Sequence, residues 1–173
     1  RYAMLETRPY QTAIIEDSVN MFTGNYLRLD GTKEVKIRSV MVESAFGSGK
    51  TVMGHLIAKQ MRALIPDLTV AWVAHRRVLL TQARNENTEK GIGVDNIHYT
   101  SMFDHNPEVL VAARARGPMM VVIDEAQHDA ATSMSHLYNL LEPEVILGLT
   151  ATPYRTDKMK LCFEKVVRNA GIH

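Results

Sequence analysis

The sequence has few of the features that mark secreted or membrane-bound proteins. Its 173 residues include one cysteine, Cys162, which excludes an internal disulfide framework and fits a reducing cell interior. No apolar run approaches the roughly 20 residues needed to span a bilayer. The N-terminus also lacks the apolar segment of a signal peptide. We therefore expect a soluble, cytoplasmic protein.

The sequence also has little net charge, no repeats and no metal-ligand pattern. Because the formal net charge is only +1, any nucleic-acid interpretation must rest on local residues. His55, His98, His105 and His136 do not have the spacing of a zinc site. Hydrophobic residues make up 46% and charged residues 23%, which is typical of a globular protein with a sizeable core. The length suits one α/β domain, spanning residues 1–173, and not two.

Short apolar runs alternate with longer amphipathic ones along the chain. The apolar runs are continuous, as expected for strands that are buried on both faces. Strands are predicted at 40–42, 68–74, 97–100, 119–123 and 145–149, and helices at 10–21, 50–64, 76–90, 107–116 and 133–141. The repeated order predicts an α/β fold with a mostly parallel central sheet, right-handed crossovers and helices on both faces.

Residues 24–38 interrupt this alternation. Asp30 and Gly31 lie between two partly alternating arms, which predicts a hairpin or a long loop. We interpret this segment as a surface excursion between a helix and a strand.

The stretch SAFGSGKT at residues 44–51 has the context of a phosphate-binding loop, because it follows a predicted strand and opens a predicted helix. Gly47 and Gly49, with Ser48 between them, allow the backbone to turn so that successive N–H groups face an anion. The helix start adds unpaired N–H groups and a positive dipole end. Ser44 stands where the usual pattern has glycine.

Two side chains of this stretch suit a nucleotide with its magnesium ion. Lys50 would reach the β- and γ-phosphates of ATP, and the Thr51 hydroxyl would bind Mg²⁺. A flexible turn is the alternative interpretation, and the loop alone does not decide between the two.

A second stretch, MMVVIDEAQH at residues 119–128, supports the nucleotide interpretation. Its apolar residues predict a strand, and Asp124 and Glu125 follow at the strand's C-terminal end, where open α/β sheets bind ligands. Asp124 would hold Mg²⁺ through its water shell, and Glu125 would orient and deprotonate the attacking water. Two solvated acids capping a strand are the alternative, which the upstream loop disfavours.

A third stretch, GLTATP at residues 148–153, follows another predicted strand. Thr150 and Thr152 would place hydroxyl groups at the same sheet edge. We interpret His128 as a coupling residue between the ATP site and these threonines, since imidazole can bridge hydroxyl and carboxylate groups.

Together these stretches resemble the first RecA-like domain of superfamily 2 helicases and translocases, over about residues 5–155 and in the family's order. SAFGSGKT resembles motif I, in which such helicases often lack the first glycine. DEAQH at 124–128 resembles motif II in its DEAH-like form, and LTATP at 149–153 resembles motif III. The resemblance implies a RecA-like P-loop NTPase fold and Mg²⁺-dependent ATP hydrolysis coupled to movement on nucleic acid.

Two further stretches resemble the family's nucleic-acid motifs. AHRRVLLTQ at 74–82 is similar to motif Ia of the restriction, repair and recombination branch, and YTSM at 99–102 is similar to a later strand-end motif. The resemblance implies contacts with the nucleic-acid backbone by His75, Arg76, Arg77, Thr100 and Ser101. A solvated helix start is the alternative for the first three. The branch favours DNA over RNA.

RPYQ at residues 8–11 resembles the adenine-recognising Q motif. Gln11 offers both a donor and an acceptor, which matches the edge of adenine. Arg8 would add a stacking or hydrogen-bonding face. A simple helix start at Arg8-Pro9 fits equally well, because proline favours the first helical turn.

The resemblance also implies a partner domain. In this family the ATP site lies between two RecA-like domains, and the second supplies arginines that contribute about 10³–10⁵ in rate. The residues after Arg155 are too few for such a domain, so we expect weak ATP binding and slow hydrolysis from this chain alone. The expected partners are nucleic acid and a second RecA-like domain, and not a membrane. An RNA helicase, or a nucleotide-dependent nucleic-acid-binding module with little turnover, remains as an alternative.

Overall fold

The computed structural model describes residues 7–44, 49–101, 107–126, 130–151, 163–168 and 171–172. Its elements are α1 (Pro9–Thr23), β1 (Ser39–Glu43), α2 (Lys50–Leu64), β2 (Thr69–Ala74), α3 (Arg77–Glu89), β3 (Ile97–Ser101), α4 (Glu108–Arg116), β4 (Met119–Asp124), α5 (Ala130–Leu141), β5 (Val145–Thr150), β6 (Lys165–Arg168) and β7 (Gly171–Ile172). Every predicted strand and helix is present, with each end within three residues of its predicted position. In the described part of the chain, no helix combines the length and hydrophobicity needed to cross a bilayer.

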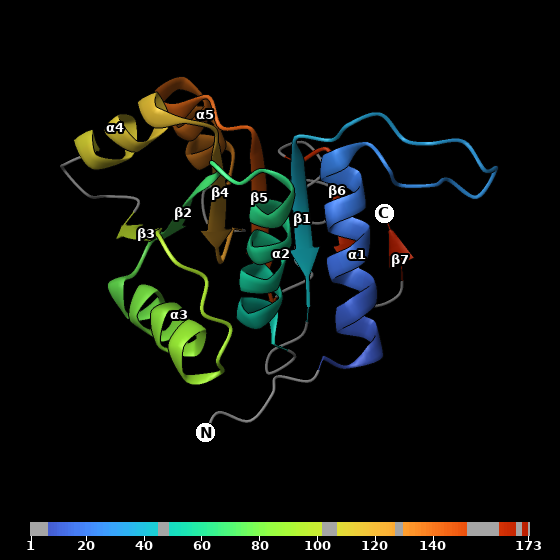
Figure 1. Cartoon of the computed structure of the whole chain (residues 1–173), viewed down its shortest axis with the longest axis horizontal. Helices are drawn as coiled ribbons and strands as arrows, with labels where there is room; N and C mark the ends of the chain where they lie inside the picture. Colours follow the sequence, from blue (N-terminus) through green and yellow to red (C-terminus); the bar gives the residue numbers. More distant parts are fainter. Residues whose placement is uncertain are drawn as a thin grey trace.

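In the described residues the strands form one seven-stranded sheet, in the order β3-β2-β4-β5-β1-β6-β7. Strands β1 to β6 are parallel and β7 is antiparallel to β6, so the predicted mostly parallel sheet is confirmed. The arrows of β1 and β4 point the same way in Figure 1. The segments that follow β1, β4 and β5 therefore meet at one edge of the sheet, where ligands of such sheets bind.

Helices cover both faces of the sheet, as predicted. Successive strand residues point to opposite faces. In β2, Val70 and Trp72 belong to the core under α1, α2 and α3, whereas Ala71 and Val73 belong to the core under α4 and α5. Helices α1 and α2 lie in front of the sheet in Figure 1. Because central strands such as β4 are buried along their whole length, their sequences are apolar without alternation.

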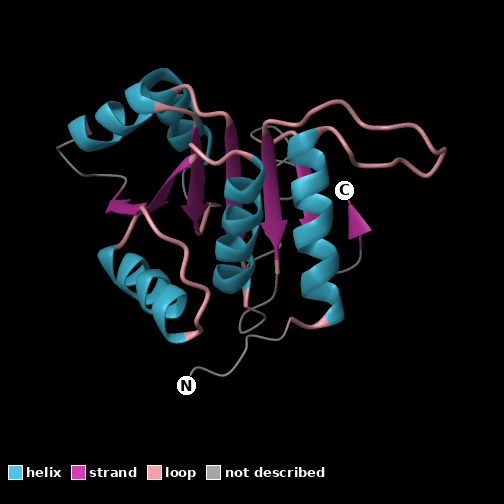
Figure 2. Cartoon of the chain, viewed as in Figure 1, coloured by secondary structure: helices cyan, strands magenta, loops and turns pink. Residues whose placement is uncertain are grey.

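Residues 24–38 form the predicted two-armed excursion, which extends away from the sheet as a long loop (Figure 2). Leu27 and Lys33 make a single antiparallel bridge between the arms. At the turn, the side-chain oxygen Oδ1 of Asp30 accepts a hydrogen bond from the Thr32 backbone N–H at 2.9 Å. The predicted turn at Asp30 is therefore confirmed.

Strands β6 and β7 were not predicted from the sequence. Strand β6 pairs with β1 in parallel, and its Val166 and Val167 are each only 1% exposed. A strand of four residues is too short to show a hydrophobic period. Its pairing with β1, more than 120 positions earlier in the chain, decides its conformation.

Gly54 sets how closely α2 approaches the sheet. A Cβ atom at this position would lie 2.9 Å from the Trp72 ring and 2.9 Å from Leu149 Cδ1. Alanine normally stabilises a helix by about 1 kcal/mol relative to glycine, but overpacking a core costs about 1–3 kcal/mol. We expect Gly54→Ala to lower the free energy of unfolding by about 1 kcal/mol in urea denaturation.

Ala63 provides the control for this prediction, because it is exposed in the same helix. Ala63→Gly reports the helix-propensity difference without a core contact. A Gly54→Ala protein that is more stable than the wild type, by about the amount that Ala63→Gly loses, would show that α2 can shift without cost.

Candidate nucleotide-binding site

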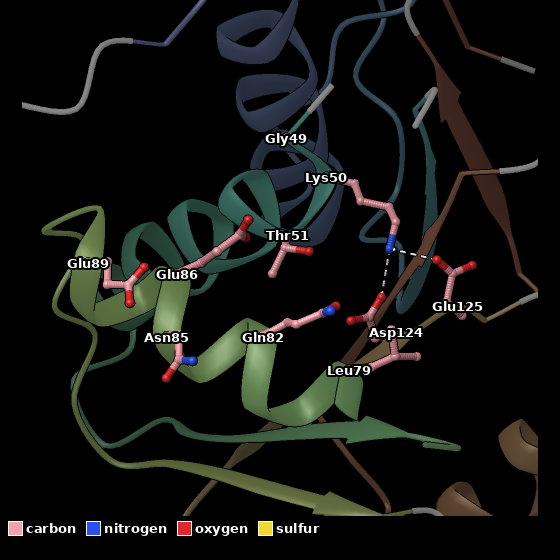
Figure 3. Close-up of a pocket in the computed structure, with 10 residues that line it drawn as sticks. All are labelled: Gly49, Lys50, Thr51, Leu79, Gln82, Asn85, Glu86, Glu89, Asp124 and Glu125. Carbon is pink, nitrogen blue, oxygen red and sulfur yellow. Dashed lines mark hydrogen bonds and ion pairs between the residues drawn. The ribbon is translucent and has the colours of Figure 1, made fainter. Parts of the chain in front are cut away.

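Lys50, the first residue of α2, contacts both carboxylates at the end of β4. Its Nζ atom lies 2.8 Å from Asp124 Oδ1 and 2.9 Å from Glu125 Oε1 (Figure 3). The Asp124 side chain is 3% exposed, and those of Lys50 and Glu125 are 14% and 15% exposed. The predicted phosphate-binding lysine and the two predicted catalytic carboxylates therefore form one largely buried ion-paired cluster.

The charges of this cluster stabilise one another. Burial by itself disfavours a charged lysine, but the attraction and hydrogen bonds of Asp124 and Glu125 outweigh it, so the pKa of Lys50 lies above its usual value. Lys50 is therefore fully charged at neutral pH. Its charge offsets the repulsion between two carboxylates held close together.

Glu125 lies in an unusual backbone conformation. Its φ is +53°, in the left-handed region that residues other than glycine seldom adopt. The next residue, Ala126, donates its N–H to the Leu149 carbonyl at 2.9 Å, which holds this turn against β5. Such strain costs on the order of 1–3 kcal/mol and clusters at functional sites. The turn keeps the Glu125 carboxylate beside Lys50.

A cavity of about 420 Å³ opens beside the cluster (Figure 3). It is lined by Gly49, Lys50, Thr51, Leu79, Gln82, Asn85, Glu86, Glu89, Asp124 and Glu125. The lining holds four carboxylates and one lysine, an excess of negative charge that suits a cation. The hydroxyl of Thr51 and the carboxylate of Asp124 are oxygen ligands of the kind that Mg²⁺ prefers.

The number of these ligands also fits magnesium. Among the described residues, no group of three or more histidine, cysteine, aspartate or glutamate side chains could hold a metal ion. Mg²⁺ is commonly bound through one or two carboxylates together with substrate phosphates and water, and needs no such group. Thr51 and Asp124 therefore fit a magnesium ion that arrives with a nucleotide.

Helix α3 forms a wall of the cavity that was not predicted. Leu79, Gln82, Glu86 and Glu89 recur at intervals of three and four residues, which places them on one face of the helix. The Oε2 atom of Glu86 is buried and has no hydrogen-bond partner among the described residues. Burial raises the pKa of Glu86 above its usual value. The spacing of these four residues predicts that they share one helix face, but it does not indicate that this face lines a cavity.

Gln11 lies against Gly49 of the predicted phosphate-binding stretch. Gly49 has a φ of +81°, and a Cβ atom there would come within 2.6 Å of Gln11 Nε2. The other amide atom, Oε1, accepts a hydrogen bond from the Arg8 backbone N–H at 2.9 Å. The side chain of Arg8 is exposed, and α1 begins at Pro9, so a helix start is present here. Adenine recognition by Gln11 and Arg8 stays a prediction.

The third predicted stretch borders the start of the loop. Thr150 is opposite Glu43 in the pairing of β5 with β1, and its carbonyl accepts a hydrogen bond from the Ser44 N–H at 2.9 Å. Ser44 is 2% exposed, so the residue that departs from the glycine pattern is packed at the base of the loop. Four predicted site residues lie outside the described residues: Gly47, Ser48, His128 and Thr152.

The residues predicted to contact nucleic acid follow or end two adjacent strands. Strands β2 and β3 are paired with Ala74 opposite Ser101. The structure therefore groups His75, Arg76, Arg77, Thr100 and Ser101 at one end of β2 and β3. Arg76 and Arg77 are exposed at the N-terminus of α3. The group is one strand away from Asp124, because β2 also pairs with β4.

Comparisons with known proteins bear on the family and the fold of this chain. The family model described as "Type III restriction enzyme, res subunit" matches residues 4–109. A 51.5 kDa protein of Lactococcus phage (isolate 7-9) is 28% identical over 115 residues, which cover 66% of this chain and 24% of that protein. The chain thus spans about a quarter of the length of this relative.

Three solved structures resemble the whole fold. The UvsW helicase of bacteriophage T4 has a TM-score of 0.64 at 13% identity, covering 96% of this chain and 62% of that one. The Sulfolobus solfataricus SWI2/SNF2 ATPase core, solved with dsDNA, has a TM-score of 0.61 at 16% identity, covering 91% of this chain and 34% of that one. The Pyrococcus furiosus Hef helicase domain has a TM-score of 0.57 at 15% identity, covering 93% of this chain and 37% of that one. At these identities the likeness shows the fold, and the predicted RecA-like fold is confirmed.

Replacing Lys50 tests the energetic weight of the buried cluster. Lys50→Met removes the cation and leaves the buried Asp124 carboxylate without a compensating charge. We expect the free energy of unfolding at pH 7 to fall by about 2–4 kcal/mol, measured by urea denaturation.

Lys36→Met is the matched control, because the ion pair of Lys36 with Glu144 lies at the surface. Their side chains are 49% and 38% exposed, respectively. Exposed pairs contribute about 0–1 kcal/mol. Equal losses in the two variants would contradict a special role for the buried cluster.

Proposed function

This chain belongs to the family of type III restriction enzyme res subunits, and we propose that it is the N-terminal ATP-binding and ATP-hydrolysing domain of a DNA helicase or translocase. The observation that carries the proposal is the contact of Lys50 with both Asp124 and Glu125. This contact holds together, beside one cavity, the lysine proposed to bind phosphate, the carboxylate proposed to bind metal and the proposed general base. The likeness to the UvsW and Hef helicase folds supports it.

Each side chain of the cluster has a distinct role in the proposed reaction. Lys50 would bind the β- and γ-phosphates of ATP, while Thr51 and Asp124 would hold Mg²⁺. A bound magnesium ion supplies positive charge that stabilises the phosphate oxygens during transfer. Glu125 would accept a proton from the attacking water, whose oxygen bonds to the γ-phosphorus as the bond to ADP breaks.

The Lys50–Glu125 contact suggests how nucleotide binding prepares the base. A carboxylate paired with an ammonium group is a weaker base than a free one, because protonation would forfeit the ion pair. The phosphates of ATP carry more negative charge than Glu125 and compete for the same ammonium group. Their binding would draw Lys50 away and free Glu125 to accept a proton.

DNA is the proposed polymer; one observation supports a nucleic-acid contact, and a second favours DNA. The exposed Arg76 and Arg77 lie at a helix N-terminus, where side chains and N–H groups can meet phosphates. The SWI2/SNF2 ATPase core with a similar fold was solved in complex with dsDNA. Stronger stimulation of ATP hydrolysis by structured RNA than by duplex DNA would instead assign the chain to an RNA helicase.

A second RecA-like domain completes the proposed enzyme. The chain covers 62% of the UvsW helicase chain. A second domain in the full-length protein would face the cavity and supply an arginine, which can contribute about 10³–10⁵ in rate. By itself this chain would hydrolyse ATP slowly, and movement along DNA would come from opening and closing of the two domains.

The role of Glu125 is tested by Glu125→Gln in the full-length protein. The substitution keeps the size of the side chain and removes the base. We expect kcat for DNA-stimulated ATP hydrolysis to fall by about 10²–10⁴-fold, in a phosphate-release assay, while ATP still binds.

Glu16→Gln on the exposed side of α1 is the control and should hydrolyse ATP at the wild-type rate. A wild-type rate in Glu125→Gln would exclude Glu125 as the base. If the wild-type protein binds ATP but does not turn it over, the chain is a binding module and the proposal fails.

The DNA-contact assignment is tested by Arg77→Ala. Loss of one phosphate contact should weaken binding to duplex DNA of any sequence and reduce the slope of log K against log salt by about 1. The measurement is fluorescence anisotropy over a salt series. Arg116→Ala, which removes an exposed arginine from α4, should leave the slope unchanged. An unchanged slope in Arg77→Ala would remove this residue from the interface.

A further inference from the structure

His55 lies at the centre of a partly buried series of hydrogen bonds that links α2 to β3. It comes one helical turn after Thr51 in α2 and is fully buried. Its Nδ1 atom is 2.8 Å from the Thr51 carbonyl oxygen, and its Nε2 atom is 2.9 Å from the Tyr99 hydroxyl oxygen. A carbonyl oxygen can only accept, so Nδ1 donates and Nε2 accepts from the Tyr99 hydroxyl. The hydrogen bonds therefore run in one direction, from Tyr99 through His55 to Thr51.

Packing alone does not account for a histidine at this position. Burial lowers the pKa of His55 to about 4, so the ring is neutral at physiological pH. The ring stacks on Trp72 with centroids 4.1 Å apart and an angle of 14° between the planes. An apolar side chain could fill such a space without the cost of burying two ring nitrogens. The specific feature that histidine adds is a link between two hydrogen-bonding partners.

Tyr99, at one end of this series of hydrogen bonds, lies next to the proposed nucleic-acid contacts. Tyr99 lies in β3 directly before Thr100 and Ser101, and it is opposite Trp72 of β2. The guanidinium carbon of Arg84, from α3, lies 5.2 Å from the centroid of its ring. Tyr99 thus contacts β2 and α3 from within β3. These are the three elements whose ends carry the residues proposed to bind DNA.

Thr51, at the other end of the series of hydrogen bonds, belongs to the proposed nucleotide site. Thr51 accepts the His55 hydrogen bond through its backbone carbonyl and provides the side-chain hydroxyl proposed to bind Mg²⁺. Lys50 is its neighbour in the first turn of α2. Because His55 is fully buried, its Nε2 atom is costly to leave without a partner. A shift of Tyr99 would therefore move the ring of His55 with it and so reach this turn of α2.

We propose that His55 and Tyr99 are positioning residues that couple the nucleotide site to the nucleic-acid contacts at the ends of β2 and β3. The inference rests on the proposed function, because that function assigns the two ligands. Coupling between two binding sites is reciprocal. DNA would therefore change the affinity for ATP by the same factor by which ATP changes the affinity for DNA, and the relay of hydrogen bonds is an element on which both ligands act.

The test measures this coupling in the full-length protein. The probe is a fluorescent ATP analogue with Mg²⁺, and its Kd is determined with and without a saturating DNA duplex. The ratio of the two Kd values is the coupling factor, expected to be about 5-fold or more in the wild type. Tyr99→Phe removes one hydroxyl group and keeps the ring. It should bring the ratio below about 2, while each ligand alone binds within about threefold of its wild-type Kd.

Tyr138→Phe is the matched control. Tyr138 is also half-buried and its hydroxyl also makes a side-chain hydrogen bond, to Ser39, but it packs against the core on the other face of the sheet. The same chemical change there should leave the coupling factor at its wild-type value. Thermal melting followed by circular dichroism verifies that both variants are folded.

A pair of substitutions at His55 separates the link from simple packing. His55→Gln can place an amide oxygen near the Nε2 position and so keep an acceptor for Tyr99. His55→Asn is shorter and can keep only a donor near the Nδ1 position. We expect a coupling factor nearer to the wild type in His55→Gln than in His55→Asn. If Tyr99→Phe does not fold, the comparison of the coupling factors of His55→Gln and His55→Asn decides the proposal.

The outcomes distinguish the relay from the proposed function. Wild-type coupling in Tyr99→Phe, or equal coupling in His55→Asn and His55→Gln, overturns the relay and leaves the proposed function intact. A wild-type protein that binds ATP and DNA with a coupling factor near one also overturns the relay. A wild-type protein that binds neither ligand overturns the proposed function itself.

Discussion

The contact of Lys50 with Asp124 and Glu125 is the interaction on which the rest of the site depends. Two buried carboxylates on adjacent residues repel each other, and a single ammonium group between them offsets this cost. The contact exists only where the start of α2 meets the end of β4. The position of α2 therefore matters for the chemistry, and that position is set by the close approach of Gly54 to Trp72.

Strand β5 makes this meeting possible, because it lies between β1 and β4 in the sheet. Its last two residues accept hydrogen bonds from both sides: the Thr150 carbonyl from Ser44, and the Leu149 carbonyl from Ala126. The backbone of β5 thus holds Ser44, at the start of the predicted phosphate-binding stretch, and the turn at Glu125 at a set separation. This structural role of Thr150 is independent of its hydroxyl group, whose predicted sensing role stays a prediction.

Helices α2 and α3 each border both the cavity and the core beside the proposed DNA contacts. In α2, Lys50 lines the cavity and His55 reaches Tyr99 in β3. In α3, Glu86 lines the cavity and Arg84 lies over the same tyrosine ring. Under the proposed coupling, a displacement on one side of either helix would reach the other side, because packed interiors have low compressibility and transmit strain. The two proposed ligands would act on a shared pair of helices.

The sequence by itself determined the α/β class and the chemistry of the site. Continuous apolar runs and helical periods are local properties of the sequence. The chemical groups at residues 49–51 and 124–125 are recognised by their place just after predicted strands. Only the tertiary structure decided which side chains meet, because contacts between distant segments leave no local pattern. It placed Gln11 against Gly49, Glu86 in the cavity wall and His55 within hydrogen-bonding distance of Tyr99, and it made a strand of β6 by pairing it with β1.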